Sequence, residues 1–283
     1  MAKRISFRRS VQVGWTLLTN GYLPGFLQGR IYTGRLKSIC VPGLNCYSCP
    51  GAFGSCPIGS LQAVMSSARY NFSFYVFGFL LLVGGLFGRL VCGFLCPFGL
   101  LQDLLHKIPF VKKIKTFPFD KQLRYLKYAI LLIFVLALPL FATTAAGIGI
   151  PWFCKYICPA GTLMAGLPLI TLNPWMQGVI GVLFFWKLGI LIFIVLLSIV
   201  IFRPFCKYIC PLGAIYAMFN KVSLFRYRVS KEKCVDCKVC NKACEMNISP
   251  YTQTNHPECI RCGDCKKACK FGAITSGFKL KGK

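Results

Sequence analysis

Cysteine gives this chain its chemistry, because 18 of its 283 residues are cysteines. Eight of them form two runs near the C-terminus with the same spacing, Cys-x2-Cys-x2-Cys-x3-Cys. The first run is Cys234, Cys237, Cys240 and Cys244, and the second is Cys259, Cys262, Cys265 and Cys269. Three closely spaced thiolates bind three irons of a cubane, and the fourth cysteine of each run crosses to the other cluster. The spacing therefore predicts two [4Fe–4S] clusters, which carry single electrons.

The crossing fixes the expected ligand sets. One cluster takes Cys234, Cys237, Cys240 and Cys269, and the other takes Cys259, Cys262, Cys265 and Cys244. The proline that usually follows each fourth cysteine is missing, because Glu245 and Lys270 stand there. This departure weakens a turn but leaves the ligands in place. Structural zinc is the alternative, but zinc sites use pairs of cysteines rather than two interlocked runs of four.

Two further cysteine pairs have the spacing Cys-x3-Cys-Pro, in GRLVCGFLCPFGLLQD (residues 88–103) and FCKYICPLG (residues 205–213). Residues i and i+4 share one face of a helix, so each pair can direct two thiolates the same way. The proline cannot donate a backbone hydrogen bond, and it limits continuation of the helix. We expect one more cubane, held by Cys92, Cys96, Cys206 and Cys210. The alternative is that these are small apolar residues of helix packing.

The phrase FCKYICPLG has a near copy, FCKYICPAG, at residues 153–161. Its two cysteines join four in the loop CVPGLNCYSCPGAFGSCPIG (residues 40–59). The six are Cys40, Cys46, Cys49, Cys56, Cys154 and Cys158. Either the four loop cysteines hold a cubane and Cys154 and Cys158 form a free dithiol or disulfide, or these two bind it with two loop cysteines. Plain disulfides are a third alternative.

The elements that position these cysteines are expected to be membrane helices. The chain is 55% hydrophobic with a mean hydropathy of +0.60, too apolar for an ordinary soluble domain. Four stretches approach the ~20 apolar residues that a membrane-spanning helix needs. They are Val11–Leu27, Phe72–Val91, Tyr125–Ala142 and Val179–Phe202. The 34 Lys and Arg against 7 Asp and Glu lie mostly at the ends of apolar runs, which indicates membrane topology rather than nucleic-acid binding.

Basic residues gather at the N-terminus, after the second stretch and after the fourth. The positive-inside rule predicts a multi-pass protein of the cytoplasmic membrane, with both termini in the cytoplasm and loops 28–71 and 143–178 outside. Two cysteine pairs, Cys92/Cys96 and Cys206/Cys210, then lie near the inner face. We expect a mostly α fold: residues 1–227 form a membrane domain of about four helices, and residues 228–283 form a small cytoplasmic α+β ferredoxin domain.

Four basic residues stand beside the cysteines of the membrane domain: Arg89, Lys155, Arg203 and Lys207. They either offset the negative charge of clusters or anchor helices at the interface. Lys187, inside the fourth stretch, either reaches the interface or meets an anionic site. The sequence has no CxxCH motif, P-loop or GxGxxG fingerprint. Its two histidines, His106 and His256, lie outside the spans, which argues against a bis-histidine haem.

The order of these elements resembles the membrane-bound ferredoxin-type proteins of the NapH/MauN group. The resemblance rests on RLVCGFLCPFGLLQD, on FCKYICPLGAIY and on the two runs of the tail, and it covers roughly residues 70–275. It implies four spans, a cytoplasmic ferredoxin domain, and membrane-proximal ligation by Cys92, Cys96, Cys206 and Cys210. The six outer cysteines are an addition, similar to a clostridial-type branch of 4Fe–4S membrane proteins. The family is known from periplasmic nitrate reductase systems. This departure from the family pattern puts nitrate reduction in doubt and suggests a path for electrons that reaches the outer face.

The leading hypothesis is an electron-transfer component rather than a stand-alone enzyme, with no catalytic residue of its own. A cytoplasmic ferredoxin or flavoprotein would reduce the tail. An extracytoplasmic thioredoxin-like protein, flavoprotein or metalloreductase would take the electrons. A hydrocarbon core about 30 Å thick is too wide for one fast tunnelling step, so clusters must sink into it or a quinone must bridge them.

Two alternative functions stay open. One is a quinol-oxidising subunit of an extracytoplasmic reductase system, with quinone as an additional cofactor. Gln102 and Asp103 are quinone-site candidates by position alone, and ordinarily such residues cap or solvate an interfacial helix. The other is a redox-sensing or maturation factor whose clusters do not turn over.

Overall fold

The computed structural model is predominantly helical, as the sequence predicts, and it describes residues 7–67, 72–109, 112–144, 149–178 and 180–278. The first helices are α1 (Phe7–Thr19), α2 (Leu23–Gln28), the 3₁₀ turn η1 (Arg35–Ser38), α3 (Pro57–Ser66), α4 (Phe74–Phe87), α5 (Leu90–Phe94), α6 (Pro97–Leu105), α7 (Asp120–Leu123), α8 (Leu126–Ile130), the π-helical η2 (Leu131–Ala137) and α9 (Leu138–Phe141).

The second half begins with two π-helical segments and ends with the ferredoxin elements. Its helices are η3 (Phe153–Ile157), α10 (Pro159–Gly161), η4 (Thr162–Gly166), α11 (Leu167–Leu172), α12 (Pro174–Gln177), α13 (Val182–Val200), α14 (Pro204–Tyr208), α15 (Pro211–Phe219), α16 (Val239–Ala243) and α17 (Asp264–Ala268). The strands β1 (Phe225–Val229) and β2 (Ile274–Phe278) pair antiparallel, with Phe225 opposite Phe278.

Two helical segments of the described residues are long and apolar enough to cross a bilayer. They are Asp120–Phe141, which joins α7 through α9, and Val182–Val200, which is α13. At 1.5 Å per residue, the 19 residues of α13 extend about 28 Å, close to the thickness of a hydrocarbon core. The segments Phe74–Phe87 and Pro159–Leu172 are apolar but shorter. Only two of the four predicted spans therefore reach spanning length.

The other two predicted spans are interrupted for local reasons. The stretch Val11–Leu27 is wrong as one helix, because α1 stops at Thr19 and α2 begins at Leu23. The second stretch is shortened where Gly88, at φ 52°, turns the chain out of α4 toward α5. A positive φ is readily adopted by glycine, so this residue permits the bend.

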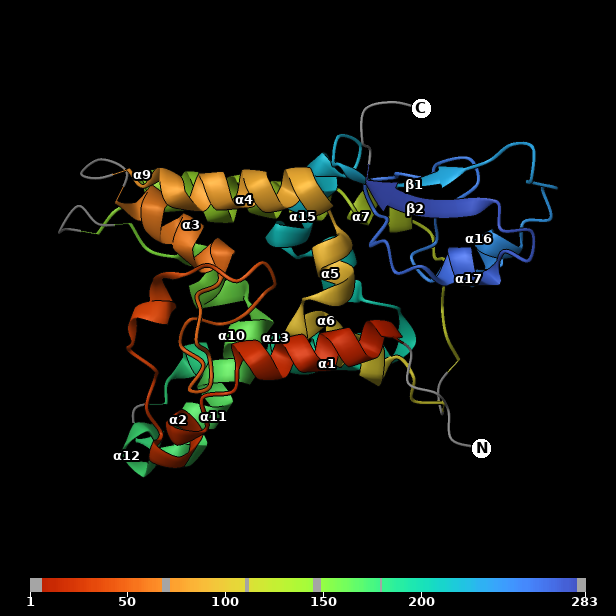
Figure 1. Cartoon of the computed structure of the whole chain (residues 1–283). Helices are drawn as coiled ribbons and strands as arrows, with labels where there is room; N and C mark the ends of the chain where they lie inside the picture. The colour runs from red at the N-terminus through yellow and green to blue at the C-terminus, as the bar shows by residue number, and fades with distance from the viewer. Residues whose placement is uncertain (1–6, 68–71, 110–111, 145–148, 179, 279–283) are drawn as a thin grey trace.

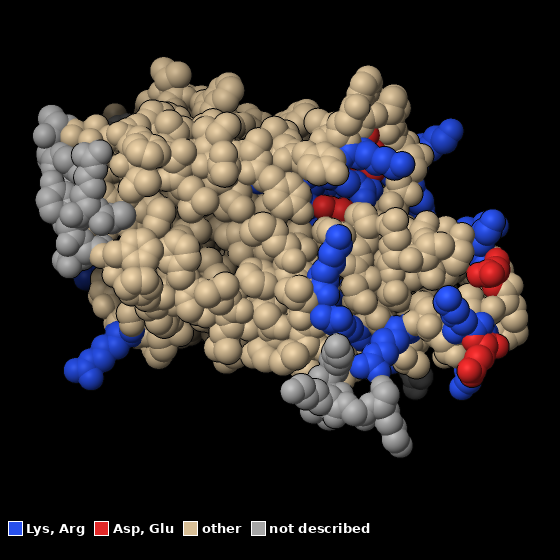
Figure 2. Space-filling model, turned by 90° about the horizontal axis from the view of Figure 1, so that it is seen from above, with Lys and Arg blue, Asp and Glu red and all other residues tan. Residues whose placement is uncertain are grey.

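The outer surface of the helical part is apolar. On α13, Val182, Phe185 and Phe193 are 86%, 63% and 61% exposed. Soluble proteins rarely expose large apolar areas of this kind, so lipid is the fitting solvent. Figure 2 shows most charged side chains gathered toward one end of the molecule, with a broad uncharged surface between them and a basic side chain near the other end. Together with the spanning helices, this surface identifies a membrane protein.

The helical part has two long sides joined by short helices, and the ferredoxin elements lie at one of its ends. In Figure 1, α4 and α1 run along opposite sides, and α5 and α6 cross between them. The ferredoxin elements β1, β2, α16 and α17 lie at one end, while α2 and α12 lie toward the other. At that second end, the Asn173 amide donates to the backbone carbonyl of Gly29 at 3.0 Å.

Buried polar contacts fix the ferredoxin elements to the helices. The Asn220 side-chain amide, at the end of α15, donates to the carbonyls of Cys259 at 2.8 Å and His256 at 3.0 Å. The Arg261 guanidinium donates to the carbonyls of Phe87 at 2.8 Å and Asn220 at 2.9 Å. These bonds hold the second cysteine run against the end of the helical part.

Candidate iron–sulfur sites

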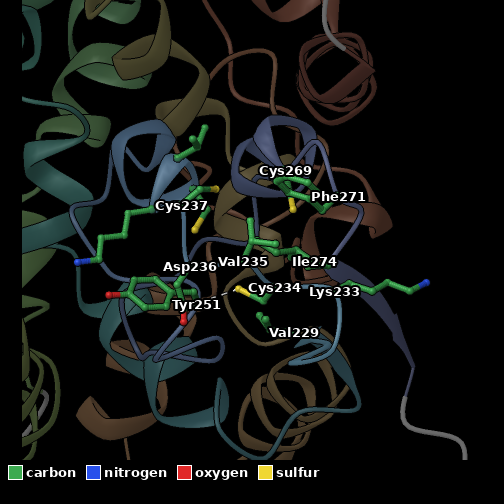
Figure 3. A pocket seen from close by; sticks show the side chains of 14 residues that line it. Val229, Lys233, Cys234, Val235, Asp236, Cys237, Tyr251, Cys269, Phe271 and Ile274 are labelled. Carbon is green, nitrogen blue, oxygen red and sulfur yellow. Dashed lines mark hydrogen bonds between the residues drawn. The ribbon is translucent and has the colours of Figure 1, made fainter.

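The eight cysteines of the C-terminal runs surround two pockets, in the sets that the crossing pattern predicts. The first ferredoxin site is lined by Cys234, Cys237, Cys240 and Cys269. The second ferredoxin site is lined by Cys244, Cys259, Cys262 and Cys265. Figure 3 shows the labelled Cys234, Cys237 and Cys269 around the first pocket, with their sulfur atoms turned toward its interior. Each set offers the four thiols that one cubane requires.

The two ferredoxin sites repeat one backbone pattern. The residue before each second cysteine, Asp236 or Arg261, has φ 49° or 54°, and the residue after it, Lys238 or Gly263, has φ 56° or 86°. These left-handed residues bend each loop tightly, so that three cysteines face one centre. The fourth cysteines, Cys244 and Cys269, are both extended, with φ −84° and −79°. A following proline would restrict them to this same extended region, so they keep that conformation without it.

The predicted inner cysteines also come together. Cys92, Cys96, Cys206 and Cys210, here called the inner site, are 5–7% exposed and lie in one buried cluster. The prediction that each pair shares one helix face needs correction. Cys92 lies in α5, but Cys96 is extended and stands between α5 and α6. Cys206 and Cys210 have the same relation to α14 and α15. The proline thus begins a helix as well as ending one.

Each Cys-Pro-x-Gly segment begins a helix, with the cysteine at the N-cap position. Proline occupies the first helical turn, where its missing N–H has no intrahelical acceptor to reach. The Gly213 N–H then donates to the Cys210 sulfur at 3.4 Å. Cys56, Cys96 and Cys158 occupy the same N-cap position without a side-chain cap bond. All four cysteines therefore stand at the N-terminal end of a helix, where the helix dipole is positive.

Two fully buried arginines lie against the inner site. Arg89 donates to the carbonyl of Cys206 at 3.0 Å and to the Glu258 carboxylate at 2.7 Å. Arg203 donates to the carbonyl of Cys92 at 2.5 Å and forms two bonds of 2.6 Å to Asp103. A guanidinium stays protonated even when buried, so both side chains bring permanent positive charge to the inner site.

Cations outnumber carboxylates in this region. Each of three buried carboxylates is shared by two basic side chains: Asp103 by Arg8 and Arg203, Asp120 by Arg124 and Lys207, and Glu258 by Arg89 and Lys127. Burial alone would raise the pKa of Glu258, but Arg89 and Lys127 hold that pKa at about 2. The surplus positive charge suits a cluster whose four thiolates make it an anion. Among the four basic residues that the sequence singles out, Lys155 is the exception, since it is exposed and lies over the Tyr156 ring.

The six remaining cysteines separate into four and two. Cys46, Cys56, Cys154 and Cys158, here called the outer site, line one cavity of about 860 Å³. Cys40 and Cys49 are buried outside its lining, and the Cys40 thiol contacts the hydroxyls of Ser55 and Ser60 at 3.7 and 3.6 Å. The structure thus brings together the second of the two arrangements that the sequence allows, with Cys154 and Cys158 joined by two loop cysteines.

The outer site has cations without carboxylates. The Lys187 ammonium donates to the carbonyl of Cys154 at 3.2 Å and lines the cavity, so it meets the site rather than the lipid interface. Lys37 also lines the cavity and donates to the carbonyl of Ala52 at 2.7 Å. The sequence contains no Asp or Glu in residues 1–102 or 121–231. An anion in the cavity is therefore the natural partner of these two lysines.

The four sites follow one another through direct contacts. Cys240 of α16 and Cys265 of α17 link the two ferredoxin sites, because these two helices pack against each other. Gly93, beside Cys92, packs on the carbonyl of Ile260, and a side chain there would collide with it. Between the inner and outer sites, Gly43 packs on the backbone of Leu95 and Cys96, where an added Cβ would lie 2.5 Å from the Leu95 carbonyl oxygen. The loop predicted to lie outside thus reaches the inner site.

Comparison with known proteins places this arrangement in a family. The model of a 4Fe-4S binding domain matches residues 71–118, 128–171 and 182–231, which together make up half of the chain. This chain belongs to the NapH/MauN-type family of 4Fe–4S membrane proteins. The matched segments of the NapH/MauN-type chain contain the inner cysteines and both copies of FCKYICP, while loop 40–59 and the two C-terminal runs lie outside them.

Several curated proteins are similar to this NapH/MauN-type chain. An uncharacterized protein from Methanocaldococcus jannaschii is 32% identical over 69% of this chain and 74% of its own length. The regulatory protein NosR of Stutzerimonas stutzeri is 31% identical over 61% of this chain and 22% of its own length. The methylamine utilization ferredoxin-type protein MauN of Paracoccus denitrificans is 29% identical over 59% of this chain and half of its own length. The chain thus spans less than two thirds of several relatives. No solved structure matches.

Two glutamines of the NapH/MauN-type chain contact the cysteines in a way that the sequence pattern did not predict. Gln62 of α3 donates to the Cys154 sulfur at 3.1 Å, and Gln102 of α6 donates to the Cys206 sulfur at 3.2 Å. Asp103 is engaged by Arg203 and Arg8. Both positional candidates for a quinone site, Gln102 and Asp103, therefore have protein partners already. The available signal was the recurrence of glutamine six residues after cysteine in CPIGSLQ and CPFGLLQ.

The thiols are arranged for neither disulfides nor a single ion. All eighteen cysteines are free, and all lie within the described residues. Across those residues, no group of three or more His, Cys, Asp and Glu side chains converges closely enough to hold one metal ion. In a cubane each thiolate binds a different iron, so its ligands stand farther apart than those of one zinc ion.

Proposed function

We propose that this NapH/MauN-type protein conducts electrons between a cytoplasmic donor and an extracytoplasmic acceptor through four [4Fe–4S] clusters. The observation that carries the proposal is the series of four cysteine quartets, which packing contacts connect from the first ferredoxin site to the outer site. Each quartet supplies the four thiolates of one cubane, so all cysteines except Cys40 and Cys49 serve as ligands.

Buried residues between the inner and outer sites bring the two clusters closer together than the thickness of the membrane core. Tyr216 of α15 is fully buried, and its hydroxyl donates to the carbonyl of Pro42 at 3.0 Å. Its side chain lies in the same buried cluster as cysteines of both membrane sites, Cys92 and Cys56. Loop 40–56 and Tyr216 thus shorten the gap between the inner and outer clusters. No single electron step then has to cross a core about 30 Å thick.

The proposed topology keeps both termini in the cytoplasm, with the ferredoxin domain of residues 228–283 at the inner face. In this topology α1 and α4 serve as short spans beside the two long ones. Short spans are tolerated when the polar loops between them are shielded by protein, as loop 40–56 is where Gly43 packs on Cys96 and Pro42 accepts from Tyr216 of α15.

The entry point for electrons is the first ferredoxin site. Its Cys237 is exposed, whereas the inner cysteines are buried. A soluble ferredoxin or flavoprotein can approach this edge. The exit point is the outer site, whose cavity of about 860 Å³ contrasts with about 20 Å³ at each ferredoxin site. A thioredoxin-like protein, flavoprotein or metalloreductase would take electrons there.

The size of the outer cavity favours a second candidate function, quinol oxidation at the outer site. Pockets for small organic ligands typically enclose about 300–1,000 Å³. The Asn45 side chain lines this cavity and is fully buried, and neither of its polar atoms has a hydrogen-bond partner in the described part of the chain. A ligand beside the cluster would supply one.

Two measurements test these functions. Anaerobically purified protein is expected to contain about 16 iron atoms and 16 acid-labile sulfides per chain, the content of four cubanes. In sealed proteoliposomes, reduced ferredoxin added at the cytoplasmic side should reduce an acceptor trapped inside, and Cys46→Ser should abolish this transfer. Reduction by quinol alone would favour the second candidate. Clusters that take up electrons but pass none on would favour a sensing or maturation factor.

A further inference from the structure

Gln62 and Gln102 are fully buried amides that make the same set of contacts at two separate sites. Besides the sulfur, each amide nitrogen reaches the backbone carbonyl four residues earlier, that of Ile58 or Phe98, at 3.3 Å. Each amide oxygen accepts a backbone N–H, from Phe153 at 3.0 Å; at Gln102 the donor is Phe205 at 3.2 Å. Every hydrogen of both amide groups is thereby assigned an acceptor.

The orientation of each amide follows from these contacts. A glutamine side chain can be turned with oxygen and nitrogen exchanged, and the surrounding donors and acceptors decide between the two. The backbone N–H of Phe153 or Phe205 can only donate, so it fixes the oxygen. The NH₂ group is then held toward the sulfur of Cys154 or Cys206.

From this geometry we infer that Gln62 and Gln102 are positioning residues that set the reduction potentials of the outer and inner clusters. The inference rests on the proposed function, in which both sites hold cubanes. A hydrogen bond to a ligand sulfur stabilises negative charge on it, and the reduced cluster carries one electron more than the oxidised cluster. Each amide therefore favours the reduced state of its own cluster.

The glutamines also join the two halves of each site. Gln62 follows Cys56 by six residues and contacts a cysteine 92 residues away, and Gln102 follows Cys96 by six and contacts one 104 residues away. One side chain thus ties the helix that begins at the second cysteine of one pair to the first cysteine of the other pair. A change of potential and a change of packing must be separated in the test.

The experiment is a reductive titration by EPR of the full-length protein, with dithionite as electron donor. The outer-cluster signal is identified by its loss in Cys46→Ser. In Gln62→Met, which keeps side-chain length but has no N–H, the reduction equilibrium constant of the outer cluster is expected to fall about tenfold. For a one-electron couple this is about 59 mV. The inner cluster should not change. Gln102→Met should give the mirror result, so each variant is the control of the other.

Four outcomes decide the matter. A shift confined to the adjacent cluster, with iron content unchanged, supports the inference. Unchanged potentials with four clusters retained overturn it, since the glutamines then only pack. Equal shifts of both clusters also overturn it, because the effect is then not local. An iron content of about 12 in the unaltered protein would instead contradict the four-cluster proposal itself.

A second variant keeps the inference testable if either methionine variant loses its cluster. Gln62→Glu keeps an oxygen that accepts from Phe153, and its carboxyl can donate to sulfur only while protonated. The outer-cluster potential of Gln62→Glu should therefore fall as pH rises from about 6 to 9, more steeply than in the unaltered protein. A potential that follows the unaltered protein across that range would overturn the inference.

Discussion

The inner and outer sites are built from the same local parts in opposite surroundings. Each places two Cys-Pro-x-Gly caps around a quartet of thiols, and each receives one glutamine amide and one basic side chain, Arg89 or Lys187, on the carbonyl of the equivalent cysteine. The inner site is sealed by ion pairs with three carboxylates. The outer site has a cavity and two lysines, without any carboxylate in its part of the sequence.

The contrast between the inner and outer sites separates the features that bind a cluster from those that decide where its electrons go. The two sites share helices that begin directly after a cysteine, and they share glutamine amides. Because these parts recur in different surroundings, we assign them to ligation and to the potential. The differences in surroundings indicate which site exchanges electrons with partners. A sealed, rigid inner site can only relay electrons between its neighbours, whereas an open outer site can exchange them with a partner or small molecule.

The largest expected effect concerns which loop cysteine completes the outer site. Cys46 lines the cavity, and Cys49 lies outside it although only three residues away. Cys46→Ser should remove one cluster, about four iron atoms per chain, while Cys49→Ser should retain all of them. Iron and sulfide analysis with EPR measures both. Equal loss in the two variants would mean that the loop can ligate through either cysteine, and the assignment of Cys46 alone to the outer site would be wrong.

The next effect compares the two basic side chains on the cysteine carbonyls. Arg89→Met leaves buried Glu258 with only Lys127, and breaking a buried ion pair costs about 3–5 kcal/mol of unfolding free energy. Lys187→Met removes a bond to one carbonyl, which costs about 1 kcal/mol. Chemical unfolding in detergent measures the difference. Adding Glu258→Gln to Arg89→Met should recover part of the loss; without recovery, the ion pair is not the cause.

The cysteine ligands of the four sites differ in how well the sequence predicts them. The ferredoxin quartets followed from spacing, because their ligands are local in the chain. The inner quartet followed from a repeated Cys-x3-Cys-Pro unit, although the helix break at Cys96 did not. The choice of Cys46 and Cys56 over Cys40 and Cys49 depends on how a loop without regular structure meets η3 and α10, and spacing carries no such information.

The spans show the same limit. Hydropathy identified α13 and the helix Asp120–Phe141 well, because each is continuous and apolar. It overestimated the first stretch, where α1 and α2 are separate helices. Hydropathy averages over a window and does not register a break in hydrogen bonding, so an interrupted helix and a continuous one look alike.

Two buried asparagines give a smaller contrast. Asn220, beside the inner site, bonds three carbonyls and accepts the Arg89 N–H at 2.9 Å. Asn220→Ala should therefore lower the unfolding free energy by about 3 kcal/mol, because several buried groups lose their partners. Asn45→Ala should change it by less than about 1 kcal/mol, because the described residues give Asn45 no partner to lose. If Asn45→Ala instead keeps stability but slows electron exit, a ligand of the outer cavity is its partner. Equal destabilisation by both variants would contradict an open outer site.

The smallest effect tests the space around the capping glycines themselves. A Cβ at Gly213 would lie 3.3 Å from both the Arg89 guanidinium and the Cys206 carbonyl. The guanidinium cannot move away easily, because it is bonded to both Glu258 and the Cys206 carbonyl. Gly213→Ala should therefore lower the free energy of unfolding by about 1–3 kcal/mol through overpacking.

At Gly161 the nearest atoms, the Cys46 sulfur and the Lys187 ammonium, are 3.8 and 4.0 Å away, which is ordinary contact. Its φ of −64° is helical, so Gly161→Ala should stabilise by up to about 1 kcal/mol through helix propensity. The two alanine variants thus have opposite expected signs in chemical unfolding. A loss at both positions would show that the outer cavity is as tightly filled in the loaded protein as the inner site, and that electrons leave by another surface.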